Sequence, residues 1–261
     1  SGLMIPSVGL SACLLRHTGR SVQVTLGFTS VETPARGNRG KERYRRRMTT
    51  GQSSDGRGPL YRLYINRLRR QLVPGNVPRH VAMMIDGNRR WAKQLGYATA
   101  AHGHRAGAAK MREFLRWCDD VGVKVASLYL LSNDNLVKRD SSELRDLIEI
   151  IAELADELSR ERDWRVPVVG RAANLPGDLA SVLADVQERT RENTGMHVNL
   201  AVGYGGRSEI VDAVRSIIAA HGGQGGSLEA LAEELTPEQI GEHLYTGGQP
   251  DPGPDRGDGP D

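Results

Sequence analysis

Two periods of apolar and polar positions alternate along most of the chain. Short apolar runs predict strands buried in a parallel sheet, and apolar residues three and four apart predict amphipathic helices. The strands are expected over residues 81–85, 123–131, 164–169 and 197–202. The helices are expected from about residue 89, and over 105–121, 141–162, 179–193, 207–221 and 228–245. Strands that alternate with helices predict a single-domain α/β fold with a largely parallel central sheet flanked by helices.

Local residues refine where these helices begin and end. Asn88 is expected to cap the first helix, and Ser141 or Ser142 to cap the helix over 141–162, because short polar side chains accept hydrogen bonds from free backbone N–H groups. The last helical region is interrupted at Thr236 and Pro237. The pattern therefore gives boundaries as well as element types.

Both ends of the chain break the alternation. Residues 1–58 are rich in Ser, Thr, Gly and Arg and lack sustained periodicity, so we expect a disordered basic extension. Residues 59–250 are expected to form the α/β domain. Residues 251–261 contain only Pro, Asp, Gly and Arg, which predicts a disordered tail.

A basic amphipathic helix is expected over residues 60–72. Leu60, Tyr64, Leu68 and Leu72 form an apolar stripe, and arginines occupy the opposite face. One interpretation is a helix packed on the domain. The other is a peripheral membrane contact, because such a helix can lie among lipid headgroups.

Charge and cysteine content exclude several classes of protein. Residues 1–80 carry 15 Lys and Arg against 3 Asp and Glu, whereas residues 81–261 carry 20 against 29, a balance of −9. An acidic domain argues against a nucleic-acid groove, so we expect no nucleic-acid partner. Two cysteines are too few for a disulfide framework or a zinc site, and no apolar run approaches the roughly 20 residues of a membrane span. We expect a cytoplasmic location, with the inner membrane face as the alternative if the helix binds lipid.

Candidate chemistry begins where the strand over 81–85 ends. Asp86 follows the strand, at the sheet edge where ligands bind in open α/β folds. Arg89 and Arg90 then follow at the start of a helix, and both features attract anions. Asp86 can hold a divalent metal that shares the same anion. The simplest ligand is a diphosphate with magnesium.

Three further segments lie near the expected strand ends. They are residues 132–135, residues 203–207, and the pair His102 and His104 in the glycine-flanked entry to the helix over 105–121. Each one alone fits a polar turn or a helix cap.

Together, the motifs resemble the cis-prenyltransferases, the undecaprenyl diphosphate synthase family. The resemblance rests on HVAMMIDGNRRWAK at residues 80–93, SNDN at 132–135 and NLAVGYGGR at 199–207, and it covers about residues 60–250. It is closest to the shorter-product actinobacterial members. It implies a homodimeric α/β transferase that uses Mg²⁺ and condenses isopentenyl diphosphate onto an allylic diphosphate, geranyl or farnesyl, with a cis double bond.

The resemblance also assigns roles to residues of this chain. Asp86 corresponds to the acidic residue that engages the magnesium diphosphate of the allylic substrate, and Asn135 to a residue for proton removal or positioning. The expected substrate-binding residues are Gly87, Asn88, Arg89, Arg90, Trp91, His104, Ser132, Asn133, Asp134 and Arg139.

Several positions depart from the family pattern. Leu136 stands where the family commonly has Trp, and Asp134 replaces the usual Glu. Leu130 and Leu131 stand where longer-chain synthases often place a small residue followed by Phe. A bulky Leu130 would shorten the apolar tunnel, so we expect a short product of about 10–20 carbons.

The end of the sequence departs furthest. After Pro252 the family continues with a strand and an Arg-x-Ser/Gly-Gly-Glu-x-Arg-x-Ser segment that binds isopentenyl diphosphate, and this sequence does not. We therefore expect a fold without the final strand and low or absent activity of the chain as written. Two alternatives stay open, namely a non-catalytic partner subunit of the same fold and an unrelated phosphate-binding α/β protein.

Overall fold

The computed structural model of the chain describes residues 13–18, 21–27, 63, 66–68, 70, 77–161, 163–223 and 227–250. Contacts divide the chain into two compact units. Of the described residues, those up to Val123 belong to the first unit and those from Lys124 to residue 250 belong to the second. One domain over residues 59–250 therefore stays a prediction, and each unit is described by itself.

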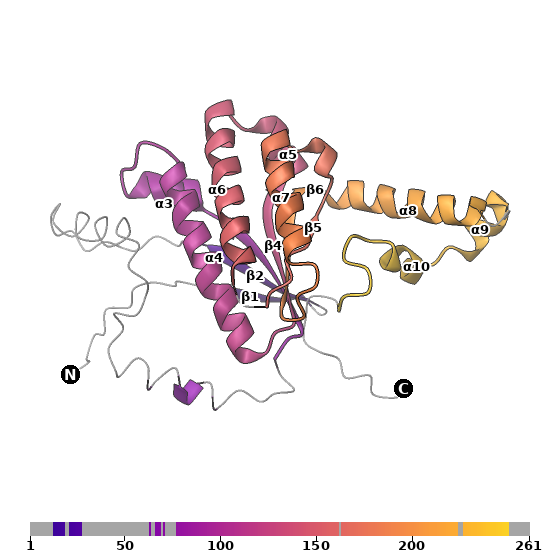
Figure 1. Cartoon of the computed structure of the whole chain (residues 1–261), viewed down its shortest axis with the longest axis horizontal. Helices are drawn as coiled ribbons and strands as arrows, with labels where there is room; N and C mark the ends of the chain where they lie inside the picture. Colours follow the sequence, from indigo (N-terminus) through magenta and orange to yellow (C-terminus); the bar gives the residue numbers. More distant parts are fainter. Residues whose placement is uncertain are drawn as a thin grey trace. The chain divides into compact units, whose positions relative to one another are not determined.

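Within the described residues up to Val123, strands precede a pair of helices that pack against each other (Figure 1). Strands β1 (Cys13–Thr18), β2 (Ser21–Gly27) and β3 (His80–Asp86) lie in that order. β1 is antiparallel to β2, and β2 is parallel to β3. Helix α3 (Asn88–Gln94) follows β3 and packs against α4 (Ala101–Val121).

The expectation of disorder over residues 1–58 is wrong for β1 and β2. Residues 21–27 alternate Ser, Gln and Thr with Val, Val and Leu, which is the period of a strand with one apolar face. A search for sustained periodicity overlooks a pattern of seven residues. The remaining residues of 1–58 and the tail over 251–261 lie outside the described residues. So does most of the helix over 60–72, of which residues 63, 66–68 and 70 are helical and exposed.

The second unit contains the other three strands and most of the helices. β4, β6 and β5 lie in the order β4-β6-β5 and are all parallel. Because β2 and β3 are also parallel, the prediction of a largely parallel sheet is confirmed. In chain order the elements are β4 (Val125–Ser132), α5 (Asn133–Lys138), α6 (Ser141–Ser159), β5 (Val168–Val169), η3 (Ala172–Asn174), α7 (Gly177–Arg189), β6 (His197–Tyr204), α8 (Gly206–Gly223), α9 (Leu228–Glu234) and α10 (Pro237–Glu242).

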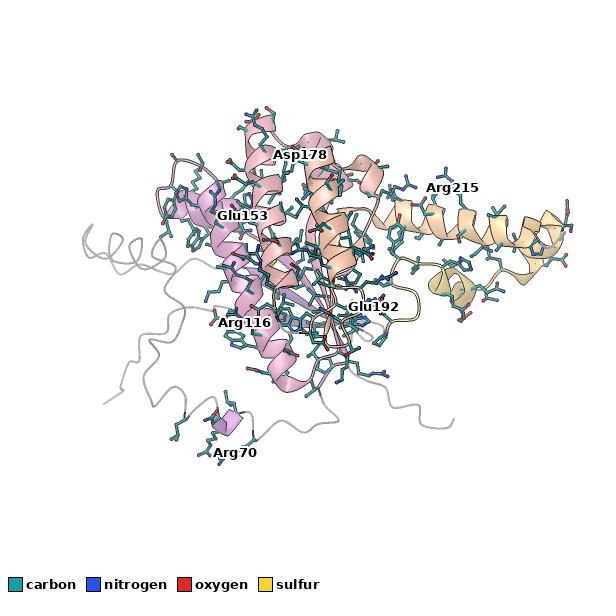
Figure 2. The ribbon with its side chains drawn as sticks, in the orientation of Figure 1. Arg70, Arg116, Glu153, Asp178, Glu192 and Arg215 are labelled. Carbon is teal, nitrogen blue, oxygen red and sulfur yellow. The ribbon has the colours of Figure 1, made fainter. Side chains whose placement is uncertain are left out.

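The core of the second unit forms between β4, β6 and the inner faces of two helices. The apolar side chains of β4 and β6 are mostly buried, as expected for parallel strands covered on both faces. α6 runs along α7, and α7 contacts β5 (Figure 1). α6 buries a helical stripe of apolar residues, namely Leu147, Ile150, Ile151, Leu154, Ala155 and Leu158. Charged side chains such as Glu153 and Asp178 lie exposed on the outer faces (Figure 2).

The carboxyl-terminal helices extend from β6. α8 leads away from the sheet, and α10 packs back against α8 (Figure 1). The predicted interruption of the last helical region is confirmed, because Thr236 begins α10 with a capping box. Its hydroxyl accepts from the Gln239 N–H, and the Gln239 side chain accepts from the Thr236 N–H. Among the described residues, no helix has both the length and the apolar character needed to cross a membrane.

Several predicted boundaries are wrong. α4 begins at Ala101, so His102 and His104 lie within the helix and not in the segment before it. The strand expected over 164–169 is reduced to Val168 and Val169, preceded by Pro167, which has no N–H to donate to a ladder.

The expected cap of α6 is also wrong. Asp140 occupies the N-cap position, and no side-chain cap bond forms there. Ser142 donates its hydroxyl to the Asp140 carboxylate at 3.1 Å. The predicted serine is therefore engaged with the cap residue, not with the helix backbone.

Candidate functional site

The predicted site residues fall into one group in each unit. The first group follows β3 and includes one residue of α4, and the second group follows β4. Both begin at the carboxyl end of a parallel strand, where open α/β folds bind ligands.

The β3 strand leads directly to an exposed carboxylate. Val81, Ala82 and Met83 are buried, whereas Asp86 is exposed at the end of the strand. One Asp86 carboxylate oxygen accepts a hydrogen bond from the Gly87 N–H at 2.6 Å. Gly87 has a φ of 89°, which only glycine adopts readily, and this turn begins α3 one residue later.

Asn88 contacts His104 and does not cap α3. Gly87 is the N-cap residue, and no side-chain cap bond is made. The expectation of an Asn88 cap is therefore wrong, because Asn88 already lies in the first turn of the helix. Its side-chain Nδ2 lies 3.5 Å from Nδ1 of His104, a buried residue of α4. The structure thus brings together two residues that are 16 positions apart.

The basic residues of this group lie on the outside. Arg89 and Arg90 are exposed on α3. Since α3 has only seven residues, we attribute the anion attraction of this segment to these two side chains and not to the helix dipole.

Aromatic rings fix the connection between α3 and α4. Trp91 is buried and stacks with Tyr97 at a centroid distance of 6.0 Å. Tyr97 in turn stacks on His102 at 4.4 Å. Tyr97 was not expected from the motifs. Trp91 thus lies inward against Tyr97, whereas Arg89 and Arg90 of the same helix are exposed.

A β-bulge marks the end of β4. Tyr129 pairs with Ala201 and Leu131 pairs with Val202, so Leu130 has no direct partner on β6. Bulges re-aim side chains and are frequent beside active sites. Leu130 is half-buried, whereas Leu131 is buried.

The segment over 132–135 is the start of a helix. The Ser132 hydroxyl caps α5 by accepting from the Asn135 N–H at 3.2 Å. The Asn133 side-chain oxygen accepts from the Asn174 amide at 3.2 Å, which links the segments after β4 and β5. Asn135 itself is half-buried.

Two charged residues of the second group are paired within the helices. Asp134 lies exposed and forms an ion pair with Lys138 at 2.9 Å, which lowers the pKa of the Asp134 carboxyl. Arg139 is half-buried and donates to the Glu143 carboxylate. Its Nε is buried and has no partner among the described residues.

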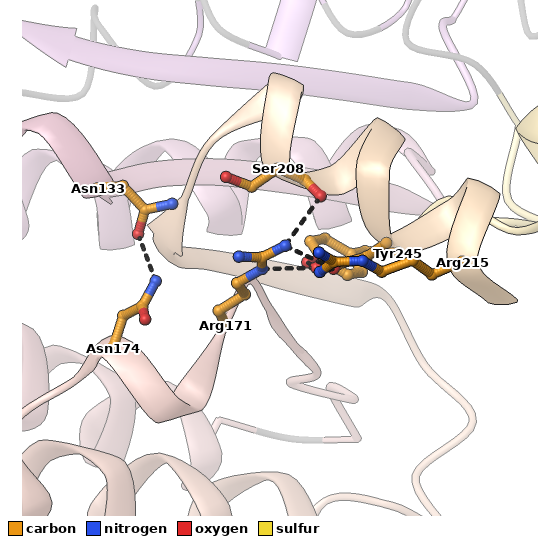
Figure 3. A network of polar contacts seen from close by, with 7 residues as sticks. Asn133, Arg171, Asn174, Ser208, Arg215 and Tyr245 are labelled. Carbon is orange, nitrogen blue, oxygen red and sulfur yellow. Dashed lines mark hydrogen bonds and ion pairs between the residues drawn. The ribbon is translucent and has the colours of Figure 1, made fainter.

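A polar network centred on Arg171, shown in Figure 3, was not expected from the motifs. Arg171 donates to both Asp212 carboxylate oxygens, at 2.7 and 2.5 Å, and Tyr245 donates its hydroxyl to the same carboxylate. These contacts lower the pKa of Asp212 to about 2. Arg171 and Asn174 are polar residues that follow a strand, the signal already used elsewhere, and it could have found them.

A second set of contacts joins the ends of β4 and β6 to α8. Tyr204 donates to the buried Glu209 at 2.7 Å, and Glu209 also accepts from the Tyr245 N–H at 3.0 Å. Tyr129 packs edge-on against Tyr204. Burial and the Glu209 hydrogen bond raise the pKa of Tyr204 well above its usual range. Tyr204 therefore stays protonated near neutral pH and acts as a donor.

The described residues hold no cluster of three or more His, Cys, Asp or Glu side chains that could bind a metal by themselves. A single carboxylate such as Asp86 suits Mg²⁺, which binds through one or two carboxylates together with substrate phosphates and waters. The donor set thus fits a magnesium ion that arrives with a diphosphate. Both groups place polar and charged side chains at strand ends of an α/β fold, an arrangement that suits an anionic substrate.

Comparison with known proteins identifies the family. The family model described as putative undecaprenyl diphosphate synthase matches residues 84–255. The chain is 48% identical to isoprenyl transferase 1 of Corynebacterium diphtheriae over 193 residues, 74% of this chain and 72% of the relative. It is 47% identical to the (2Z,6E)-farnesyl diphosphate synthase of Mycobacterium tuberculosis over 197 residues, 74% of this chain and 75% of the relative.

A solved structure shares the fold. The crystal structure of lavandulyl diphosphate synthase from Lavandula x intermedia, in complex with dimethylallyl diphosphate, superposes with a TM-score of 0.58 at 30% identity, covering 65% of this chain and 72% of that chain. The chain therefore belongs to the undecaprenyl diphosphate synthase family of cis-prenyltransferases. It is a prenyltransferase, and the expected cis-prenyl condensation is confirmed at this level. The alternatives of a non-catalytic subunit and of an unrelated phosphate-binding protein are not favoured.

Proposed function

We propose that this chain condenses isopentenyl diphosphate with geranyl or farnesyl diphosphate to form a short Z-prenyl diphosphate. The observation that carries the proposal is the turn after β3, where one exposed carboxylate and two exposed guanidinium groups stand within five residues. That combination matches a metal-bound diphosphate. The names of relatives, including short-chain Z-isoprenyl diphosphate synthase in Mycobacterium bovis, support a short product.

The reaction sets the chemical requirements of the site. The C1–O bond of the allylic diphosphate breaks and diphosphate leaves with the electron pair. C1 then bonds to C4 of isopentenyl diphosphate, whose C2 loses a proton to form the new double bond. The site must therefore stabilise a departing anion, orient a second diphosphate and accept a proton.

The first group would bind the departing diphosphate. Arg89 and Arg90 would contact its oxygens, with backbone N–H groups of Gly87 and Asn88 beside them. Asp86 would hold magnesium, which when bound neutralises negative charge on the leaving group. Trp91 would support this segment from inside, and we assign His104 a phosphate contact or help with proton removal.

The second group would serve isopentenyl diphosphate and the proton. Ser132 and Asn133 would contact the substrate, with Asp134 and Arg139 at the rim of the segment. Asn135 would position the group that loses the proton, because an amide can orient a substrate or a water but is a poor base.

A binding assay tests the diphosphate site without depending on turnover. We expect the non-reactive analogue geranyl S-thiolodiphosphate to bind in the presence of Mg²⁺, measured by calorimetry. Asp86→Asn should abolish the magnesium dependence, and Arg90→Gln should weaken binding by about tenfold or more, the effect of one charge-assisted hydrogen bond. Asp178→Asn, which removes an exposed carboxylate of α7, is the matched control. Unchanged, magnesium-dependent binding by Asp86→Asn would refute the assignment.

Leu130 is proposed to limit product length. The bulge at the end of β4 gives its side chain a direction that the regular strand does not impose. Leu130→Ala should therefore lengthen the product, as determined by chromatography of the dephosphorylated prenols, whereas Leu131→Val should not. No change in chain length for Leu130→Ala would contradict the assignment.

A homodimer is proposed through α8. Ile210, Val211 and Ile218 are exposed on this helix by 52%, 45% and 42%, respectively. Val211 and Ile218 are seven residues, about two turns, apart and so lie on one face, with Ile210 next to Val211. A second copy of the chain would cover them. Ile218→Lys should shift the mass measured by light scattering from dimer to monomer, and a wild-type monomer at micromolar concentration would exclude the proposal.

A cytoplasmic location also stays a proposal, supported by the low cysteine content.

A further inference from the structure

The helices α3 and α4 approach so closely at two glycines that no side chain fits between them. A Cβ added to Gly103 would overlap the backbone carbonyl oxygen of Asn88. A Cβ added to Gly107, one turn further along α4, would lie 2.9 Å from both Nδ2 and Oδ1 of the Asn88 side chain. Both glycines are buried. Gly103 therefore admits the backbone of Asn88, and Gly107 admits its amide.

The space left by these glycines determines where the Asn88 amide lies. Its Oδ1 is buried without a hydrogen-bond partner among the described residues, and its Nδ2 lies 3.5 Å from His104 Nδ1. An amide can face an imidazole in two ways. Nδ2 donates to an unprotonated Nδ1, whereas Oδ1 accepts from a protonated Nδ1. Asn88 can therefore satisfy either state of His104, provided that nothing displaces it.

We infer that Gly103 and Gly107 are positioning residues, whose missing side chains hold the Asn88 amide against His104. This inference rests on the proposed function for the phosphate-binding role of His104, but the geometry does not depend on it. Neither glycine touches the substrate in this scheme. They act through Asn88 alone, and Gly107 does so through the side chain.

The distinction between backbone and side chain gives a sharp test. Gly107→Ala places a methyl group against the Asn88 amide, so Asn88→Ala in the same chain should relieve the conflict. Gly103→Ala conflicts with the backbone carbonyl, which Asn88→Ala leaves in place. We therefore expect Asn88→Ala to rescue the urea midpoint of Gly107→Ala but not that of Gly103→Ala. Gly177→Ala, where an added Cβ meets nothing within 4 Å, should leave the midpoint near the wild-type value.

Two readouts separate positioning from general destabilisation. The ¹⁵N shifts of the His104 imidazole should change in Gly107→Ala and in Asn88→Ala, with no further change in the double variant. Binding of geranyl S-thiolodiphosphate with Mg²⁺ should weaken about tenfold in both single variants and no further in the double variant, because each change removes the amide that orients His104, to which we assign a phosphate contact.

Particular results would overturn the inference. The first is a folded Gly107→Ala variant whose His104 ¹⁵N shifts equal those of the wild type. The second is a loss of stability from Gly107→Ala that is the same in the wild-type chain and in the Asn88→Ala variant. The third is a urea midpoint of Gly103→Ala that Asn88→Ala restores. If Gly107→Ala fails to fold, recovery of folding in the double variant supports the inference and failure of both contradicts it. Changed His104 shifts with unchanged ligand binding would support the positioning and contradict the phosphate contact proposed for His104.

Discussion

Asn199 is predicted to be the most sensitive buried polar residue of the second unit. It lies on β6 with 1% of its surface exposed, directly opposite Ser127 of β4. Its Nδ2 donates to the Ser127 hydroxyl at 2.9 Å and to Gln249 Oε1 at 2.6 Å, and its Oδ1 accepts from Gln249 Nε2 at 3.3 Å. One side chain thus joins two strands to the segment that follows α10.

Asn199→Leu keeps the volume and removes all three hydrogen bonds. At a net 0.5–1.5 kcal/mol each, the loss is about 2–4 kcal/mol, because the buried Ser127 hydroxyl and the half-buried Gln249 amide lose their partner. For a unit of this size the midpoint of thermal unfolding should fall by about 5–15 °C. Urea unfolding followed by circular dichroism measures the free energy directly.

The reasoning also predicts a coupling. Gln249→Ala removes two of the three bonds, so the two substitutions together should cost less than the sum of their separate effects. Hydrogen exchange should become faster at residues 245–249 in either variant. Asn174→Ala, at an exposed position, is the control and should cost less than about 0.5 kcal/mol. Strict additivity, or a loss below about 0.5 kcal/mol for Asn199→Leu, would refute the argument.

Three further predictions concern other parts of the fold. Thr236→Ala removes the α10 capping box and should cost about 1 kcal/mol of unfolding free energy, measured in urea. The pKa of Asp212 is lowered to about 2, so its contact with Arg171 stabilises the fold fully above the ordinary carboxyl pKa and less as the pH falls towards 2. The free energy of unfolding of Asp212→Asn, measured against pH, should therefore lack this part of the decrease. Burial raises the pKa of Cys118 to about 12, so iodoacetamide at about pH 8 should label Cys118 only after unfolding. Labelling is mapped by mass spectrometry, and rapid labelling of the folded chain would contradict the prediction.

The features predicted correctly from sequence are local ones. The strand that ends at Asp86 is a bounded apolar run followed by glycine, and both signals lie within about ten residues. The interruption of the last helical region at Thr236 and Pro237 needs only these two neighbouring residues. In each case the residues that determine the structure are neighbours in the chain, so their pattern is visible without knowledge of packing.

The features that were missed depend on residues far apart. Arg171 meets Asp212 across 41 positions, and neither residue alone predicts the pair. The bulge at Leu130 is a property of two strands, because it appears only when the register of β4 on β6 is known. Asn88 was assigned to a helix cap because its residue type favours one, but tertiary packing against α4 places it elsewhere.

Pairing distinguishes the two arginines that the motifs assign to substrate. Arg139 is half-buried and already donates to the Glu143 carboxylate, so an anion that binds it must compete with that group. Arg90 is exposed on α3, and no ion pair of Arg90 is found within the described part of the chain. A diphosphate in water therefore meets Arg90 without displacing a carboxylate. We therefore propose that Arg90 binds the diphosphate more strongly than Arg139 does, because the charge of Arg139 is already compensated by Glu143.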